Sequence, residues 1–71
     1  MNRTPVSSSN IASIGYDSRT QTLEVEFNNG SVYQYHGVPA GIYQGLMGAP
    51  SHGEYLDTYV KKGGYAYTRI L

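Results

Sequence analysis

The sequence predicts an α+β fold, in which a small, mainly antiparallel sheet carries two short helices packed on one face. Residues 22–27, TLEVEF, alternate strictly between polar and apolar side chains, as half-buried strands do. The segment NNG follows and marks a hairpin bend before a second, tyrosine-rich strand. Farther on, apolar residues recur four apart between Pro39 and Gly63, as they do in helices. Together these patterns predict the element order β-β-β-α-α-β.

One domain accounts for the chain, because 71 residues cannot bury two separate cores. We expect this domain to span residues 10–71. Residues 1–9, which include Thr4-Pro5 and a run of serines, have too little apolar surface to offset the entropy cost of ordering them. They are predicted to form a flexible amino-terminal arm.

The outer strands are the less strongly marked ones. The first is expected at residues 11–16, with Ala12, Ile14 and Tyr16 on one side. The last is expected at residues 65–70, where large and small side chains alternate. A strand at the edge of a sheet has unpaired backbone groups, so it is expected either to be protected from pairing with other chains or to bind one of them.

The length of the hairpin bend decides which way the two tyrosines of the next strand point. A two-residue bend would place them beside the acidic side chains of the preceding strand. A three-residue bend, with Gly30 in the left-handed conformation, pairs Val25 with Tyr33 and Leu23 with Tyr35. We predict the three-residue bend, because apolar cross-strand pairs each contribute about 0.2–1 kcal/mol. It leaves the polar side chains of both strands facing solvent: Glu24, Glu26, Gln34 and His36.

Tyr33 and Tyr35 have two possible roles. Their rings could stack on nucleic-acid bases, as rings on strands do in several single-strand binders. The alternative, which the predicted bend favours, is that they are structural and pack beneath a helix. On this interpretation the core is formed by the following residues: Leu23, Val25, Phe27, Tyr33, Tyr35, Ile42, Leu46, Leu56 and Val60.

The two helices have different boundary signals. The first is expected to begin at Pro39 and to end before the next proline, with Gly45 as a weak point that costs about 0.5–1 kcal/mol relative to alanine. The second is expected to begin after Ser51, which has capping-box spacing to a glutamate three residues later. Asp57 lies four residues before Lys61, a spacing that favours an ion pair on a helix.

The polar residues do not predict an enzyme, a metal site or a cofactor. His36 and His52 lack the neighbouring ligands that a metal site needs. The position of Ser51 favours a role as a helix cap over a role as a nucleophile beside His52. Glu24 and Glu26 share a strand face, but nothing near them in the sequence would raise the pKa of one, so we interpret that face as solvated.

Composition limits the partners and the compartment. Five basic and five acidic residues give a formal net charge of zero, which removes the long-range positive field of a general phosphate-backbone binder. The absence of cysteine fits a reducing compartment. The first residues contain no apolar run, so we expect neither a signal peptide nor contact with a membrane. A cytoplasmic protein is therefore predicted.

Basic and aromatic residues are interleaved near the carboxyl end. Lys61, Lys62 and Arg69 lie close in sequence to Tyr65 and Tyr67, so three of the five basic residues fall in the last eleven positions. Cations beside rings are typical of nucleic-acid sites. The alternative is a helix end favoured by its dipole, followed by a partly buried strand. These five residues are our candidate nucleic-acid-binding site.

Four segments resemble the KTSC domain family: SSNIASIGYD, TLEVEFNNGSVYQYHGVP, YQGLMGAPSHGEY and YAYTRI. The likeness covers about residues 7–70, and the family's central Tyr-x-Tyr corresponds to Tyr33 and Tyr35. Leu56-Asp57 stands where the family often has Phe-Asn. The family is named for its occurrence at the carboxyl end of some lysyl-tRNA synthetases, and it also occurs as a free-standing bacterial protein. The resemblance implies the predicted fold and suggests RNA as a ligand.

The leading hypothesis is a small non-enzymatic binding module whose ligand is RNA, either tRNA or a single strand, held by the carboxyl-terminal patch. The alternative is a protein-interaction or homodimerising module that pairs with itself or with another protein through the exposed edge of the first or last strand.

Overall fold

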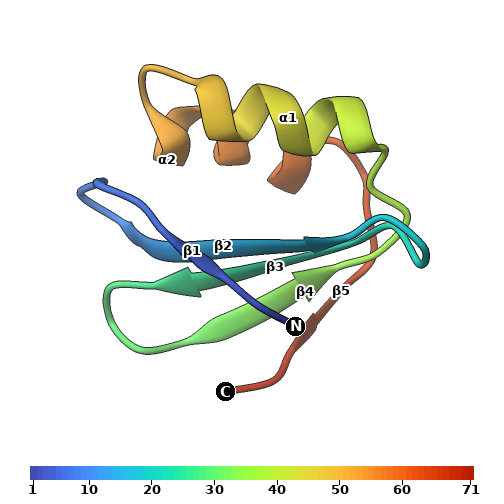
Figure 1. Cartoon of the computed structure of the whole chain (residues 1–71), viewed down its shortest axis with the longest axis horizontal. Helices are drawn as coiled ribbons and strands as arrows, with labels where there is room; N and C mark the ends of the chain where they lie inside the picture. Colours follow the sequence, from blue (N-terminus) through green and yellow to red (C-terminus); the bar gives the residue numbers. More distant parts are fainter.

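Five strands form one antiparallel sheet in the order β1-β2-β3-β4-β5 in the computed structural model, which describes residues 1–71. The strands are β1 (Thr4–Pro5), β2 (Ile11–Asp17), β3 (Thr22–Phe27), β4 (Val32–Tyr35) and β5 (Tyr67–Arg69). The helical segments α1 (Ala40–Gly48), α2 (His52–Tyr55) and η1 (Leu56–Lys61) connect β4 to β5 and lie over one face of the sheet (Figure 1). The predicted α+β class and its element order are confirmed, with β1 as an additional strand. No helical segment is long and apolar enough to cross a membrane.

The amino-terminal residues differ from the expected flexible arm. Thr4 and Pro5 form the edge strand β1 and pair with Ile14 and Ser13 of β2. The residues before β1 continue across the sheet, where a Cβ at Gly15 would lie only 2.7 Å from the carbonyl oxygen of Asn2. The bare glycine backbone therefore permits this close approach. The segment is held by backbone pairing and by an ion pair described below, neither of which its polar composition indicates.

Strand β2 contains a bulge that changes which side chains face the helices. The pairing with β3 shifts between Ile11 and Ser13, so that Ala12 is the extra residue. Ile11 and Ile14 are consequently both in the core and fully buried, whereas Ala12 is outside it. The prediction that Ala12, Ile14 and Tyr16 share one side was wrong at Ala12, because strict alternation does not anticipate a bulge.

The β3–β4 hairpin has the predicted three-residue bend. Gly30 has a φ of 90°, the left-handed conformation that the bend requires. Val25 pairs with Tyr33, and Leu23 pairs with Tyr35. The predicted register is therefore confirmed, and both tyrosine rings project from the face that the helices cover.

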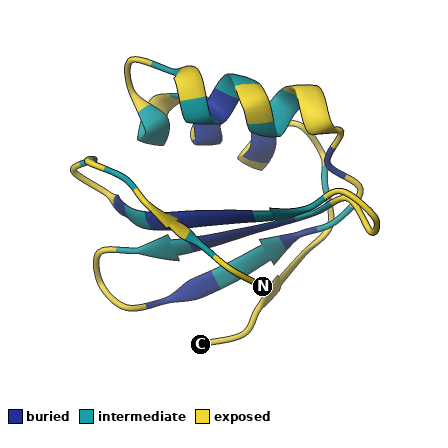
Figure 2. Cartoon of the chain, in the orientation of Figure 1, coloured by how far each residue is buried: buried dark blue, intermediate teal, exposed yellow.

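The core lies between this face and the helices (Figure 2). Its buried members are Ile11, Ile14, Leu23, Val25, Tyr35, Val38, Leu46, Leu56 and Val60. Phe27, Tyr33 and Ile42, which were expected in the core, are only partly buried and pack against its margin. For Phe27 and Tyr33 the reason is a cleft that opens above them, described in the next section.

The two helices approach each other closely at one glycine. A Cβ at Gly45 of α1 would lie 2.7 Å from Cζ of Tyr55 in α2, so any side chain there would collide with the Tyr55 ring. The interior glycine that weakens α1 is thus the point where α2 packs against it. Ser51 caps α2 as predicted, because its hydroxyl oxygen accepts a hydrogen bond of 3.3 Å from the backbone N–H of Glu54.

The chain continues from α2 as a π-helical segment, η1. The backbone N–H of Lys62 donates to the carbonyl oxygen of Asp57, five residues earlier, over 3.1 Å. Each turn of such a segment contains about one residue more than an α-helical turn. This extra residue changes which side chains lie above one another at the end of η1.

Candidate nucleic-acid interface

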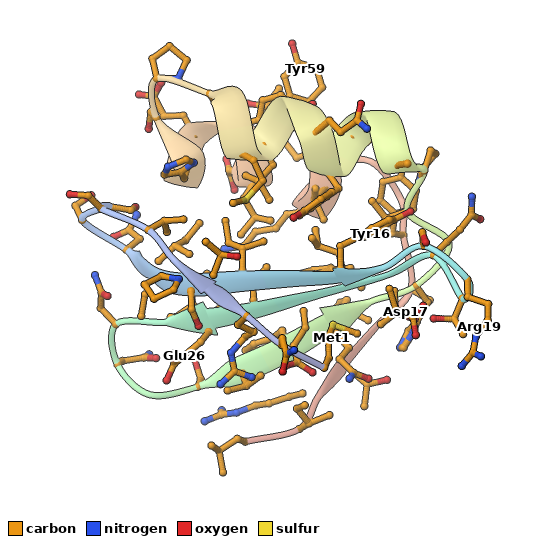
Figure 3. The ribbon with its side chains drawn as sticks, viewed as in Figure 1. Met1, Tyr16, Asp17, Arg19, Glu26 and Tyr59 are labelled. Atoms are coloured by element: carbon orange, nitrogen blue, oxygen red, sulfur yellow. The ribbon has the colours of Figure 1, made fainter.

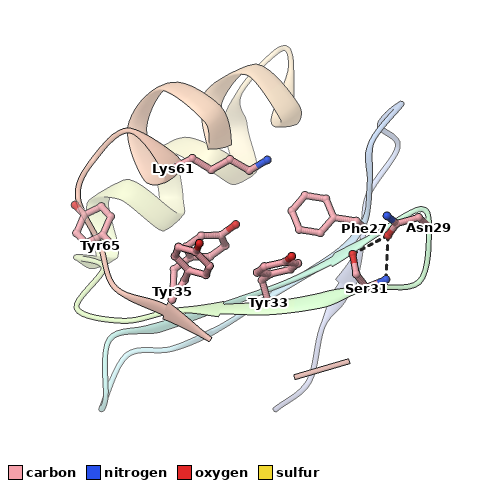
Figure 4. A pocket seen from close by; sticks show the side chains of 8 residues that line it. Phe27, Asn29, Ser31, Tyr33, Tyr35, Lys61 and Tyr65 are labelled. Atoms are coloured by element: carbon pink, nitrogen blue, oxygen red, sulfur yellow. Dashed lines mark hydrogen bonds between the residues drawn. The ribbon is translucent and has the colours of Figure 1, made fainter. Parts of the chain in front are cut away.

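An open aromatic cleft lies on the helix-covered face of the sheet, beside the end of η1 (Figure 4). Strands β3, β4 and β5 supply its floor, and η1 and the loop after it supply one wall. Its volume is about 450 Å³. The lining residues are Phe27, Asn29, Ser31, Tyr33, Tyr35, Lys61, Tyr65 and Tyr67.

The rings on the floor of the cleft contact one another. Phe27 meets Tyr33 edge-on, with ring centroids 5.7 Å apart and planes at 85°. Tyr67 lies 5.9 Å from Tyr33 and 6.0 Å from Tyr35. These separations are typical of aromatic pairs in protein cores. Tyr67 is nevertheless 64% exposed and Tyr33 only partly buried, so ring surface remains open to a ligand.

Two cations lie against these rings. The Lys61 Nζ is 5.2 Å from the centroid of Phe27, and the Arg69 Cζ is 5.9 Å from that of Tyr33. Both distances are within the range of cation–π attraction. Neither cation pairs with a side-chain carboxylate, since the cations that do so are Arg3 and Lys62. The Arg69 Nε donates to the Leu71 oxygen over 3.2 Å. The remaining N–H groups of both cations can meet an anionic group.

The structure brings together most of the predicted candidate residues. Lys61, Tyr65 and Tyr67 line the cleft, and Arg69 lies beside it against Tyr33. Lys62 does not join them: its Nζ is 3.4 Å from Oδ2 of Asp57. The expected pair between Asp57 and Lys61 does not form, because the π-helical turn places Lys62 beside the carboxylate instead.

Tyr35 and Tyr33, which were predicted to be structural, differ in their surroundings. Tyr35 is 4% exposed and belongs to the core, although it also reaches the cleft. Burial raises the pKa of its phenol to about 12, and the neighbouring phenols of Tyr33 and Tyr67 add to the shift. Tyr33 both packs against the core and presents its ring to the cleft.

Three lining residues were not predicted as site residues: Phe27, Asn29 and Ser31. The register of the hairpin already implied that Phe27 shares a face with Tyr33. Its contact with Lys61 depends on how η1 ends, and no local sequence signal indicates that. Asn29 and Ser31 belong to the bend, whose sequence indicates only a turn.

The opposite face of the sheet carries a polar cluster organised by Arg3. Its Nη1 lies 2.5 Å from Oε2 of Glu24, and its Nε donates to Oγ of Ser13 over 2.9 Å. Ser13 in turn donates to Oε1 of Glu26 over 2.8 Å, and Gln34 donates to Oε1 of Glu24 over 2.9 Å. Figure 3 shows Glu26 and Met1 on the side of the sheet away from the helices.

Glu24 is therefore not solvated as predicted, but is 5% exposed. Burial raises the pKa of its carboxyl group, but the hydrogen bonds from Gln34 and Arg3 and the charge of Arg3 outweigh burial and hold the pKa below its ordinary value. The prediction that Glu24 faces solvent was wrong because residues 1–9 were expected to be flexible. In the structure, Arg3 from this segment covers the face of the sheet that carries Glu24. An acid/base pair at Glu24 and Glu26 has no support here, since Arg3 pairs with Glu24 and holds its pKa down rather than raising it.

The two histidines have separate partners. His36 Nε2 lies 3.1 Å from Oγ1 of Thr68, and His52 Nδ1 lies 2.8 Å from the carbonyl oxygen of Leu46. No group of three or more potential metal ligands converges anywhere on the chain. The cleft is thus the feature with the clearest capacity to bind a ligand.

Known proteins resemble this chain over nearly its whole length. The family model of the KTSC domain matches residues 7–67. An uncharacterized protein of Stutzerimonas stutzeri is 41% identical over 70 residues, which is 99% of each chain. The crystal structure of a KTSC domain protein from Yersinia pestis is 45% identical and has a TM-score of 0.88, covering 99% of this chain and 97% of that one.

A second kind of relative is much longer. A lysine–tRNA ligase of Trichormus variabilis is 44% identical over 55 residues, which is 78% of this chain but 10% of the ligase. A lysine–tRNA ligase of Nostoc punctiforme is 42% identical over 51 residues, 72% of this chain and 9% of that protein. The chain therefore corresponds to about a tenth of each ligase.

Proposed function

Because this chain belongs to the KTSC domain family, we propose that it is a small non-enzymatic module that binds single-stranded RNA in the aromatic cleft. Lysine–tRNA ligases are among the proteins that contain a related segment, and by name they act on tRNA. The occurrence of a related segment in these ligases supports RNA as the ligand class. A binding role rather than a catalytic one is supported by the two histidines, each of which has a hydrogen-bond partner in the fold and forms no ion pair with a carboxylate.

The observation that carries the proposal is the combination of accessible rings with two cations, one lining the cleft and one beside it, that pair with no side-chain carboxylate. Stacking of a base on an aromatic side chain contributes about 1–3 kcal/mol. Tyr67 and Tyr33 offer ring surface. Lys61 lies 5.2 Å from the centroid of Phe27 and Arg69 lies 5.9 Å from that of Tyr33, and this closeness of cations to rings supports phosphate contacts by a strand stacked there. The cleft volume of about 450 Å³ accommodates a nucleobase.

The electrostatic contribution is expected to be small. The chain has no net charge, so only the local cations attract the strand. If Lys61 and Arg69 each neutralise one phosphate, log K should fall with log salt concentration with a slope of about −1.4, since a single strand contributes about −0.7 for each phosphate. We therefore expect a modest affinity for RNA. Stacking contributes to this affinity, and the affinity falls as the salt concentration rises.

A titration with a mixed-sequence single-stranded octanucleotide tests the proposal, with amide shifts recorded for each residue. We expect shifts centred on the cleft at Phe27, Tyr33, Lys61 and Tyr67, and a change in tyrosine fluorescence. Absence of binding at low salt would refute the proposal. Shifts centred on Arg3 and its partners would instead move the site to the other face.

A second candidate is homodimerisation through β5, an edge strand of the sheet. The residues at and after it are exposed and partly apolar: Tyr67 is 64%, Ile70 48% and Leu71 72% exposed. Strands of this kind can add a second chain to a sheet. Light scattering distinguishes the two, since a tight dimer without affinity for RNA favours pairing and a monomer that binds RNA favours the cleft.

A further inference from the structure

Asn29 at the mouth of the cleft has a fixed amide orientation. Its Oδ1 accepts two hydrogen bonds from Ser31, one of 3.0 Å from the backbone N–H and one of 2.7 Å from the hydroxyl. A backbone N–H can only donate, so the atom that faces it must be the amide oxygen. Figure 4 shows both bonds, with the Asn29 nitrogen turned away from Ser31 toward Phe27.

The amide nitrogen of Asn29 donates to no group of the protein, so its two N–H groups remain available at the rim that the cleft shares with a neighbouring pocket. Lys61, which lies over the Phe27 ring, also only donates. The hydroxyl of Ser31 uses its proton on Asn29 and donates nothing to the cleft. The side-chain nitrogens at this end of the cleft, Asn29 Nδ2 and Lys61 Nζ, are therefore both donors.

We propose that this end of the cleft recognises the keto oxygen of a uracil or guanine base and discriminates against adenine. The proposal rests on the RNA-binding function proposed above and specifies its base preference. A keto oxygen accepts a hydrogen bond from Asn29 Nδ2, with Lys61 Nζ as a second donor nearby, while the base stacks on the rings beside them. Adenine has an exocyclic amine in the corresponding place, and its N–H groups would face donors.

Base preference can be separated from stacking by comparing three labelled hexanucleotides: hexauridylate, hexaadenylate, and a hexamer in which inosine replaces every adenosine. Inosine keeps the purine body but has a keto oxygen where adenosine has an amine. We expect hexauridylate and the inosine hexamer to bind roughly fivefold or more tightly than hexaadenylate in fluorescence anisotropy, by analogy with hydrogen-bonded base readout.

The variant Asn29→Asp tests the assigned residue. Aspartate can still accept both hydrogen bonds from Ser31 and so preserve the bend, but its second oxygen is an acceptor in place of the donor. The control Gln44→Glu changes the net charge equally at an exposed position of α1 that does not line the cleft. We expect the ratio of keto to amino affinities to fall to near one in Asn29→Asp and to persist in Gln44→Glu.

The outcomes separate the two proposals. If the wild type binds all three hexamers equally, or prefers hexaadenylate, the base preference is overturned while RNA binding stands. If the preference persists in folded Asn29→Asp, as judged by its amide spectrum, the assignment to Asn29 is overturned. If no hexamer and no longer single strand binds, the proposed function itself fails.

Discussion

The carboxylate of Asp57 pairs with Lys62, five residues later, with 3.4 Å between Oδ2 and Nζ. An α-helix would bring Lys61 beside Asp57 instead, because side chains four residues apart lie on the same face. The π-helical hydrogen bonding of η1 shifts this relationship by one residue. Lys61 is left free of the carboxylate and lies over the ring of Phe27. The helical geometry of η1 therefore decides which of two adjacent lysines faces the cleft.

The first prediction compares these two lysines. Lys61→Ala should weaken the binding of a single-stranded RNA by about three- to tenfold and reduce the salt slope by about 0.7, because it removes one phosphate contact. Lys62→Ala removes the same charge from a residue already paired with Asp57, so it should change affinity less than about twofold. Anisotropy titrations at several salt concentrations measure both. Equal losses in the two variants would argue against a localised site.

The second prediction concerns the helix contact at Gly45. Gly45→Ala should destabilise the protein by about 1–3 kcal/mol, because the new methyl group collides with the ring of Tyr55. Gly41→Ala is the matched control, since a Cβ there meets nothing within 4 Å. This second change should stabilise α1 by about 0.4–1 kcal/mol through lower backbone entropy in the unfolded chain. Urea denaturation of both variants provides the comparison, and a stabilised Gly45→Ala would contradict the close packing.

The third prediction concerns pH and Glu24. The folded-state pKa of Glu24 is below its ordinary value of 4.5, so the stabilisation it provides is fully present above pH 4.5 and is lost as the pH falls through the lower folded-state value. Glu24→Gln should cost about 1.5–3 kcal/mol at pH 7, the range for hydrogen bonds to charged groups. The difference in free energy of unfolding between wild type and Glu24→Gln should become smaller as the pH falls below 4.5.

Urea denaturation between pH 7 and pH 3 would measure this difference. The control is Glu54→Gln, which neutralises an exposed carboxylate that makes no ion pair and should change stability by less than about 0.5 kcal/mol. A constant difference between wild type and Glu24→Gln over the whole range would show that Arg3 does not stabilise the charged carboxylate.

The fourth prediction concerns alkaline pH and Tyr35. Its folded-state pKa is raised from 10.0 to about 12, so its contribution to stability is fully present below pH 10 and is lost as the pH rises toward 12. Tyr35→Phe should lose less stability over this interval than the wild type does. Tyr35 belongs to the core and also reaches the cleft, so phenylalanine keeps the buried ring and removes only the ionisable hydroxyl.

Urea midpoints at several pH values between 9 and about 11.5 would detect the effect of Tyr35 ionisation. Tyr59→Phe serves as the control, because Tyr59 is 52% exposed and lies on the helical segment. Tyr59→Phe should follow the wild-type pH dependence. If Tyr35→Phe does so as well, the ring of Tyr35 is better solvated than its burial indicates.

The sequence correctly predicted those elements that depend on residues only a few positions apart. The bend at Gly30 requires a positive φ, and the strict alternation of β3 defines one face, so the register of Val25 and Tyr33 followed. The cap at Ser51 likewise depends on a residue only three positions away. Such features are determined by nearest neighbours along the chain, which the sequence displays directly.

The features that were missed depend on contacts between distant segments. The strand β1 is held by Ser13 and Ile14 and by the pairing of Arg3 with Glu24, twenty-one residues away. The bulge at Ala12 follows from pairing with β3 rather than from its own sequence. The cleft forms because the end of η1 lies beside the hairpin bend. The sequence of neither segment predicts that the two lie together.

The crossing of residues 1–3 over Gly15 gives the molecule two unequal sides. Met1 lies against the Arg3 side of the sheet, whereas the rings of Tyr33 and Tyr67 open on the other. A linker or a dye attached at Met1 would therefore point away from the cleft, and one attached at Leu71 would sit two residues from Arg69. Immobilisation for binding measurements should use the amino end.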